Sequence, residues 1–297
     1  MILQQLVNAL SLSGIYILFA VGLSLGWGMA KILNLAYGAM FMLAAFVAYL
    51  VSTSVSFSFW VLLPLAMLIG GAVCVIAETL AFRPVRRSIP DRHQAELGML
   101  IASIGVSSII VGAVQNVTRA EVKNLPPGTF PLSTFVAGGV RITNLQIVVF
   151  VLSMVLTGLI GWWVARTRTG RALRGVAYSP ETSALLGVNS DRVTLLVMFV
   201  SGLVAGGAGL LLAVYFSAVD AHMGDGLLLK AFAIIILGGI GSIPGTIVGG
   251  FLLAFAETFT AAYVSTAFKD AIAFAFILAV HLVRPEGLFS RGRFERA

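Results

Sequence analysis

The sequence predicts an all-α polytopic membrane protein, a bundle of about eight to nine transmembrane helices with broken segments. Asp, Glu, Lys and Arg make up only 10% of the 297 residues, whereas hydrophobic residues make up 59%. Soluble domains carry roughly 25% charged residues, so this chain has too little polar surface to cover a compact domain in water. Mean hydropathy is +1.02, and the apolar residues fall in long runs. Both features indicate a chain that folds in a bilayer.

The length predicts a single transmembrane domain over residues 1–297. At about 20 residues a span, eight or nine spans and their connections use up the chain. No room is left for a separate soluble domain of the usual size. The one cysteine, Cys74, lies inside an apolar run, so a disulfide framework within the chain is excluded and a thiol-based metal site is not expected. The histidines are scattered without metal-site spacing, and we expect neither a metal nor a cofactor.

Nine apolar runs are the candidate helices. They lack the alternation of polar and apolar residues that marks strands of an outer-membrane barrel. No basic residue precedes the first run, and no small-residue cleavage pattern follows it, so we expect it to remain as a helix and not to be removed as a signal peptide. The runs are about 9–29, 36–52, 59–82, 97–115, 144–165, 193–216, 227–239, 245–264 and 270–283.

The basic residues predict the orientation. Thirteen of the 19 Lys and Arg residues lie in two connections and the tail, and the positive-inside rule places all three in the cytoplasm. The net charge of +7 therefore requires no nucleic acid. The connection 116–143 and the N-terminus then face outward, while the number of crossings after residue 217 stays open. The three basic groups are Arg83, Arg86, Arg87 and Arg92; Arg166, Arg168, Arg171, Arg174 and Arg192; and Arg284, Arg291, Arg293 and Arg296.

Two segments interrupt the apolar runs, Gly26 to Gly38 and Gly238 to Gly245. Non-helical backbone at membrane depth is tolerated only where protein buries it or water reaches it, and in transporters such breaks often lie near the substrate path. Glycines at four-residue spacing also serve close helix packing with no functional role. Pro244 favours a true break in the second segment. The candidate residues of a translocation path are Asn34, Tyr37, Gly38, Gly238, Gly239, Gly241, Ser242, Gly245 and Glu257.

Glu257 is the ionisable residue that stands out inside an apolar run. Intramembrane charges are costly, so a carboxylate there is expected to face the bundle interior, paired or hydrated. Lys230 is intermediate, near a predicted outer end. Interface placement and snorkelling account for the other ionisable residues, because Glu78 follows its run toward Arg83, Lys269 and Asp270 adjoin a helix start, and His281 precedes Arg284.

The connection 166–192 contains the start and stop signals of a short ordered helix. Ser179 is suited to the N-cap, Pro180 to the first helical position and Glu181 to the positive end of the helix dipole. Gly187 can close the helix in the left-handed conformation. Ala184, Leu185 and Leu186 then form a small apolar knob, which fits either a groove in a partner protein or the membrane surface.

Five segments in order resemble the permease subunits of branched-chain amino acid ABC importers of the LivH type, and the resemblance covers nearly the whole chain. Tyr37 and Ser179 stand where the family more often has His and Asp. The segments are Leu33 to Gly38, Arg83 to Arg86, Gly170 to Val188, Leu237 to Gly245, and Arg284 to Phe289.

The resemblance implies that the chain is one subunit of a larger transport complex. Segment 179–187 would be the coupling helix that docks on the ATPase, with Ser179, Pro180, Glu181, Ala184, Leu185 and Gly187 as its coupling residues. The partners would be a sister permease, two ATP-binding-cassette ATPase subunits and a periplasmic substrate-binding protein, assembled in the bacterial inner membrane. The implied solute is a branched-chain or other hydrophobic amino acid, although the same family includes urea and short-amide importers.

Two other classes of function compete with a transport subunit. An ion-coupled secondary transporter needs buried carboxylates on its ion path, and only Glu257 qualifies. A membrane-embedded enzyme is least favoured, because the sequence has no His-Glu-x-x-His and no nucleophile near a base. None of the four lysines lies in a phosphate-binding Gly-Lys-Ser/Thr motif, so the energy for transport must come from a partner subunit.

Overall fold

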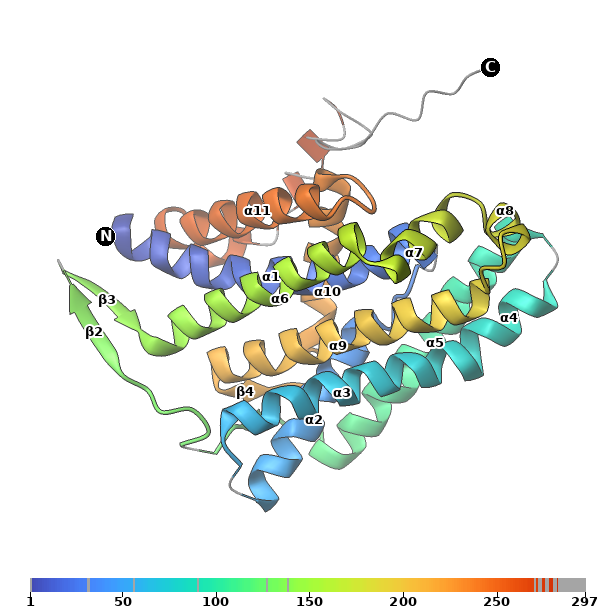
Figure 1. The fold of residues 1–297 in the computed structure, drawn as a ribbon. Coiled ribbons are helices and arrows are strands. Elements are labelled where there is room, and N and C mark those ends of the chain that lie inside the picture. Colours follow the sequence, from blue (N-terminus) through green and yellow to red (C-terminus); the bar gives the residue numbers. More distant parts are fainter. Residues whose placement is uncertain are drawn as a thin grey trace.

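The computed structural model describes residues 2–30, 33–55, 57–89, 91–126, 128–137 and 139–269, with six further residues between 271 and 282. Helices form most of this part of the chain (Figure 1). The long helices are α1 (Ile2–Ala30), α2 (Tyr37–Ser54), α3 (Phe59–Ala77), α5 (Arg92–Thr118), α6 (Asn144–Arg166), α9 (Ser190–Phe216), α10 (Met223–Gly238) and α11 (Ile243–Tyr263). The shorter ones are the π-helical turn η1 (Glu78–Phe82), α4 (Arg83–Ser88), α7 (Arg168–Tyr178), α8 (Pro180–Leu185) and the 3₁₀ turn η2 (Thr266–Phe268).

Eight of the nine predicted apolar runs are helical, which confirms the all-α membrane bundle. Seven helical segments of the described chain are long and apolar enough to cross a bilayer. α10, with 16 residues, is shorter than the roughly 20 residues that a straight crossing needs. The ninth run, 270–283, lies outside the continuously described residues, as do Asp270, His281 and the basic tail. The seven segments are Ile2–Gly28, Tyr37–Ser54, Phe59–Ser88, Gln94–Thr118, Asn144–Arg166, Ser190–Phe216 and Ile243–Tyr263.

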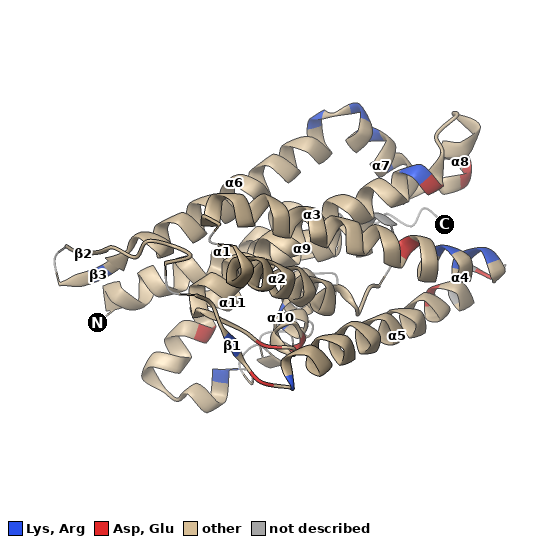
Figure 2. Ribbon diagram, turned by 90° about the horizontal axis from the view of Figure 1, so that it is seen from below, with Lys and Arg blue, Asp and Glu red and all other residues tan. Residues whose placement is uncertain are grey.

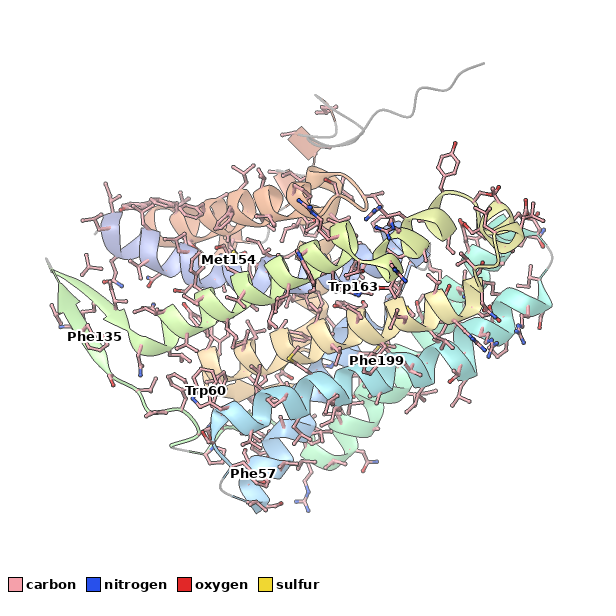
Figure 3. The ribbon with its side chains drawn as sticks, in the orientation of Figure 1. Phe57, Trp60, Phe135, Met154, Trp163 and Phe199 are labelled. Carbon is pink, nitrogen blue, oxygen red and sulfur yellow. The ribbon has the colours of Figure 1, made fainter. Side chains whose placement is uncertain are left out.

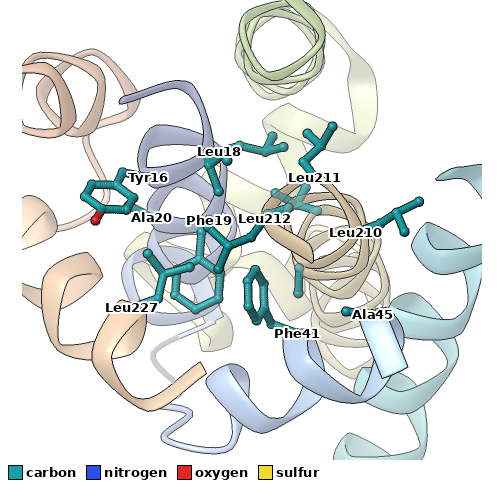
Figure 4. Packing of buried hydrophobic residues seen from close by; sticks show 14 of the residues in the cluster. Tyr16, Leu18, Phe19, Ala20, Phe41, Ala45, Leu210, Leu211, Leu212 and Leu227 are labelled. Carbon is teal, nitrogen blue, oxygen red and sulfur yellow. The ribbon is translucent and has the colours of Figure 1, made fainter. Parts of the chain in front are cut away.

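Helices α1 and α9 form the centre of the bundle. In the most apolar stretch of each, 72% of the residues are buried, compared with 17% in α5. Large side chains from α1, α2 and α9, among them Phe19, Phe41 and Leu211, fill the space between the helices (Figure 4). Apolar side chains also cover the outside of the bundle (Figure 3), as at Trp60 and Ile109. An apolar exterior of this extent is suited to lipid.

Close approach of α3 to α9 depends on glycine. A Cβ placed on Gly202 or on Gly206 would overlap backbone atoms of α3, and one on Gly70 would overlap backbone atoms of α9. The two helices pack along their length, as small residues at helix interfaces permit in membranes. α3 and α9 therefore form a tightly packed pair, in which α9 also contributes to the core.

The two ends of the bundle differ in charge. The first two predicted basic groups lie together at the end that carries α4, α7 and α8 (Figure 2). The start of α1 lies at the opposite end, where the Gln4 side chain donates a 2.9 Å hydrogen bond to the carbonyl oxygen of Arg141. The N-terminal residues and the connection 116–143 are thus on the same side, as the charge pattern predicted.

The connection 116–143 contains strands that the sequence did not indicate. Strand β2 (Thr134–Ala137) pairs antiparallel with β3 (Val140–Thr143), and β1 (Lys123–Asn124) pairs antiparallel with β4 (Ala218–Val219). The β1–β4 pair ties this connection to the end of α9. Thr143 and Gln146 form a capping box that starts α6, which satisfies backbone donors at the helix N-terminus.

Candidate functional site

The first helix break lies inside the bundle and not at its end. α1 ends at Ala30 and α2 begins at Tyr37, and the Leu35 N–H donates a 3.1 Å hydrogen bond to the hydroxyl oxygen of Ser103. Ser103 lies near the middle of α5, so the non-helical segment reaches the depth at which backbone groups must find partners within the protein. Lys31 and Ile32 lie outside the described residues. The predicted break is confirmed but is shorter than Gly26 to Gly38, because α1 continues to Ala30 and α2 already contains Tyr37 and Gly38.

Tyr37 and Asn34 are buried at this break. The Tyr37 hydroxyl donates a 3.0 Å hydrogen bond to the carbonyl oxygen of Ser201, and its ring centroid lies 4.8 Å from that of Phe19. Asn34 is buried, and its side-chain carbonyl oxygen has no hydrogen-bond partner among the described residues. In this conformation Tyr37 fills the space beside Gly22 in α1, whereas Asn34 has an unsatisfied acceptor within the bundle.

The second break is confirmed as a non-helical turn between two helices. α10 ends at Gly238, and Gly239 and Gly241 have φ angles of 97° and 80°, a region that side chains with a Cβ rarely adopt. Ser242 caps α11 by accepting a 3.2 Å hydrogen bond from the Gly245 N–H, and Pro244 lies in the first turn. The glycine and proline signals therefore correctly predicted the end of α10 and the start of α11.

The last turn of α1, just before the first break, contacts the second break. A Cβ on Gly28 would overlap the Cα of Gly241, so α1 touches the second break through bare backbone. Gly238 and Gly245 pack backbone to backbone in the same way, and a Cβ on Gly38 would lie 2.7 Å from the carbonyl oxygen of Gly224 in α10. The packing role of these glycines is thus supported directly. The tertiary structure also brings together two segments that lie about 200 residues apart in the sequence.

Glu257 is buried and paired, as its position in an apolar run predicted. Its Oε1 atom lies 2.8 Å from the Nζ atoms of both Lys230 and Lys269. The Tyr16 hydroxyl donates a 3.1 Å hydrogen bond to the same oxygen, and Figure 4 shows Tyr16 pointing from α1 toward α10 and α11. The Glu257 Oε2 atom has no hydrogen-bond partner among the described residues.

The sequence did not predict the partner of Lys269. Its ammonium group contacts Glu257, and that of Lys230 does the same from α10, whereas the placement of Lys269 at the membrane interface stays a prediction. Their partner was missed because the residues lie on different segments, and only the α10–α11 hairpin brings Lys230 to Glu257. The two helix breaks and this charge cluster share α1, α10 and α11, so the same three helices frame the candidate path.

Glu78 is buried within the protein, which its position near Arg83 did not predict. Its Oε1 atom lies 2.6 Å from the Nη2 atom of Arg86 at the basic end, and its placement at the membrane interface stays a prediction. The π-helical turn η1 begins at Glu78, with the Arg83 N–H bonded to the Glu78 carbonyl oxygen. Such turns insert an extra residue and change which face a side chain occupies, which no apolar periodicity revealed.

The short helix α8 forms an exposed corner at the arginine-rich end. Ser179 accepts a 3.2 Å hydrogen bond from the Thr182 N–H, Pro180 and Glu181 lie in the first turn, and Gly187 has a φ angle of 81°. These features confirm the predicted capping. Ala184 is exposed, and the Leu185 and Leu186 side chains are 89% and 80% exposed, so the knob contacts nothing within the described chain that would cover it. We call residues 180–187 the corner.

Ser183 anchors the corner and was missed by sequence reasoning. Its side chain is buried, and a Cβ on Gly175 of α7 would lie 3.2 Å from its hydroxyl oxygen. The Val188 N–H donates a 3.0 Å hydrogen bond to the Ser183 carbonyl oxygen. The corner is therefore held by α7 on one side and by a closed turn on the other.

Gly187→Val is expected to displace the corner. A β-branched residue at a positive φ is disfavoured by about 1–2 kcal/mol relative to glycine, so the turn should rearrange and the knob should move. We expect membrane insertion to persist while solute uptake falls at least about fivefold. Gly187→Asn is the control, because Asn tolerates this conformation and should retain most uptake. Wild-type uptake with Val would show that the cap does not matter.

This architecture defines a class of protein. A polytopic helical bundle with two helix breaks and an exposed capped helix at its basic end is the architecture expected of a membrane transport subunit. Residues 5–281 match the family described as the permease component of branched-chain amino acid transport systems. The chain belongs to this family and is a multi-pass membrane permease component, not an enzyme.

Curated relatives agree with the family. The chain is 32% identical to the high-affinity branched-chain amino acid transport system permease protein BraD of Pseudomonas aeruginosa, over 99% of this chain and 97% of that protein. It is 30% identical to LivH of Escherichia coli, over the same shares of the two chains. The autoinducer 2 import system permease protein LsrC of an Enterobacter species is 33% identical over 52% of this chain and 45% of that protein. No solved structure matches the chain.

Proposed function

We propose that this chain forms the translocation path for branched-chain or other hydrophobic amino acids in an ATP-binding-cassette importer. The observation that carries the proposal is the backbone contact between Gly28, in the last turn of α1 before the first break, and Gly241 in the second break. Backbone freed from helical hydrogen bonds inside a bilayer must be satisfied by protein, water or solute. The names of the relatives BraD and LivH supply the solute class.

The proposed path follows the residues of the two breaks and Glu257. Asn34 contributes the unsatisfied acceptor noted above, and Tyr37 is the buried side chain that fills the space beside Gly22. The other path residues have small side chains or none, so the helices that carry them can move apart without rearranging bulky side chains. They are Gly38, Gly238, Gly239, Gly241, Ser242 and Gly245. Because its carboxylate already pairs with Lys230 and Lys269, we assign Glu257 to holding the frame of the path.

We further propose that the corner docks on the ATPase. Under this proposal residues 166–192 are a cytoplasmic coupling segment, residues 116–143 are an outer loop, and residues 1–297 are one permease domain in the bacterial inner membrane. A capped helix with exposed leucines suits insertion into a groove. The complete importer would contain a sister permease, two ATPase subunits and a periplasmic substrate-binding protein.

The solute is tested by uptake. In a strain lacking this gene, labelled leucine, glutamate and urea are offered to cells that carry the wild-type chain or an empty vector. We expect the wild-type chain to restore leucine uptake alone. Restoration of urea uptake instead would favour the urea or short-amide alternative. Uptake that persists when the ATPase is inactivated and collapses with the ion gradient would favour a secondary transporter and overturn the proposal.

The path is tested by thiol labelling. Cys74 is buried and is first replaced by Ala; Ser242→Cys should then react with a water-soluble thiol reagent in the assembled importer, because water must reach unwound backbone on a path. Its reactivity should differ between nucleotide-free and ATP-trapped states. Ser153→Cys is the control, since Ser153 is buried in α6 and should stay unreactive. Absence of labelling at Ser242 in both states would assign the second break to packing alone.

A further inference from the structure

A continuous helical rod carries three arginines at its basic end. α3 passes through the π-helical turn η1 into α4 without leaving the helix, so Phe59–Ser88 forms one segment. Arg83, Arg86 and Arg87 are three and four residues apart, and this spacing places them on one face of a helix. That face is directed at the first turn of α9.

Asp191 receives these arginines. Its Oδ2 atom lies 2.8 Å from the Nη2 atom of Arg83 and 2.6 Å from that of Arg87, and its Oδ1 atom lies 3.9 Å from Arg86. Arg86 also pairs with the buried Glu78. One carboxylate at the start of α9 is therefore held by a whole face of the α3–α4 rod. We call the three arginines and Asp191 the clamp.

The clamp adjoins the corner. Asn189 caps α9 by accepting a 3.1 Å hydrogen bond from the Arg192 N–H, so Asp191 is in the first helical turn after Gly187. The turn between them is closed by hydrogen bonds from the N–H groups of Gly187 and Val188 to the carbonyl oxygens of Ala184 and Ser183, each of 3.0 Å. Only Val188 and Asn189 separate the corner from the start of α9, so a displacement of the corner acts directly on the first turn of α9.

The same helix reaches the first break. Within α9, the Ser201 hydroxyl donates a 2.7 Å hydrogen bond to the carbonyl oxygen of Gly22. The Ser201 carbonyl oxygen accepts the hydrogen bond from Tyr37. α9 thus connects Asp191 at the basic end with α1 and with the first residue of α2.

We propose that Asp191 is a positioning residue for coupling. The clamp holds the first turn of α9 on the α3–α4 rod, so that movement of the corner passes along α9 to Ser201 and Tyr37 and is not absorbed by tilting of one helical turn. Partly exposed ion pairs are modest in energy, which lets the clamp rearrange during a transport cycle. This inference rests on the proposed docking of the corner on an ATPase.

Asp191→Asn in the complete importer tests the clamp. The variant chain is assembled with its partner permease, ATPases and binding protein in proteoliposomes, and leucine uptake and ATP hydrolysis are measured on the same vesicles. We expect near wild-type assembly and hydrolysis, with uptake per ATP about fivefold lower, since charge-assisted hydrogen bonds are replaced by weaker ones. Asp191→Glu keeps the charge and should restore most of the ratio.

Glu121→Gln is the matched control. Its carboxylate pairs with Lys123 at the opposite end of the bundle, so the same loss of charge should leave uptake per ATP unchanged. A wild-type ratio in assembled Asp191→Asn importer overturns the inference. If Asp191→Asn assembles poorly, Arg87→Gln replaces it, because Arg87 is more exposed than Arg83 and Arg86; its ratio should also fall, and a wild-type ratio overturns the clamp.

A separate arm tests the docking proposal. Leu185→Cys, in the chain without Cys74, should cross-link to the ATPase when Asp191 is intact. Absence of this cross-link with assembled importer would defeat the docking proposal itself. A normal cross-link together with an unchanged uptake ratio in Asp191→Asn would defeat only the clamp.

Discussion

Glu257→Gln is expected to lower the free energy of unfolding by about 3–5 kcal/mol, as removal of one member of a buried ion pair does. The Glu257 side chain is 1% exposed, and its Oε1 atom is shared by Lys230, Lys269 and Tyr16. Glutamine leaves two ammonium groups in an apolar bundle with one carboxylate fewer. Denaturant unfolding of the purified chain in mixed micelles measures the change, and the yield of assembled importer should fall with it.

A second variant separates the ion pairs from general damage. Lys230→Met with Glu257→Gln removes one cation together with the carboxylate, so the double variant should be more stable than Glu257→Gln alone. Glu121→Gln, which breaks an exposed pair, should unfold like the wild type. If Glu257→Gln itself unfolds at the wild-type denaturant concentration, the pairs contribute nothing to stability, and Glu257 is only a tolerated polar residue.

Leu185→Asp is expected to release the ATPase from the chain. The Leu185 side chain is 89% exposed, so the substitution costs little within the chain. In a complex it would bury a carboxylate in an apolar groove. Central interface residues contribute about 2 kcal/mol or more, which is roughly 30-fold in affinity. Retention of the ATPase on the purified, tagged chain measures the loss, and uptake should fall in parallel.

The control for Leu185→Asp lies at the other end of the bundle. Leu132 is 65% exposed in the connection 116–143, so Leu132→Asp places the same charge on a surface remote from the corner. The ATPase should be retained at wild-type level. If Leu185→Asp also retains it, docking of the corner on the ATPase is refuted, and an amphipathic helix on the membrane surface becomes the favoured role of the corner.

Local sequence signals predicted where helices begin and end. Ser179, Pro180 and Gly187 mark the start and end of α8 because capping depends on one residue and its immediate neighbours. Ser242 and Pro244 mark the start of α11 for the same reason. The apolar runs predicted eight of the described helices because a bilayer requires a continuous apolar stretch from each spanning segment.

Contacts between distant segments were not predictable in this way. Nothing near Lys230 or Lys269 in the sequence identifies Glu257 as their shared partner. Asp191 likewise reads as an ordinary residue of the first helical turn, where its charge suits the helix dipole. Only the packing of α3 on α9 brings it to Arg83 and Arg87.

The sequence by itself determined the membrane class, the places where helices stop and the capped exposed corner. Each follows from composition or from residues within a few positions of one another. The tertiary structure alone decided that Gly28 meets Gly241, that Glu257 lies among two lysines and that Ser201 links α9 to Tyr37. These contacts depend on how helices cross, and crossing is set by shape complementarity summed over many small residues, which no single stretch of the chain contains.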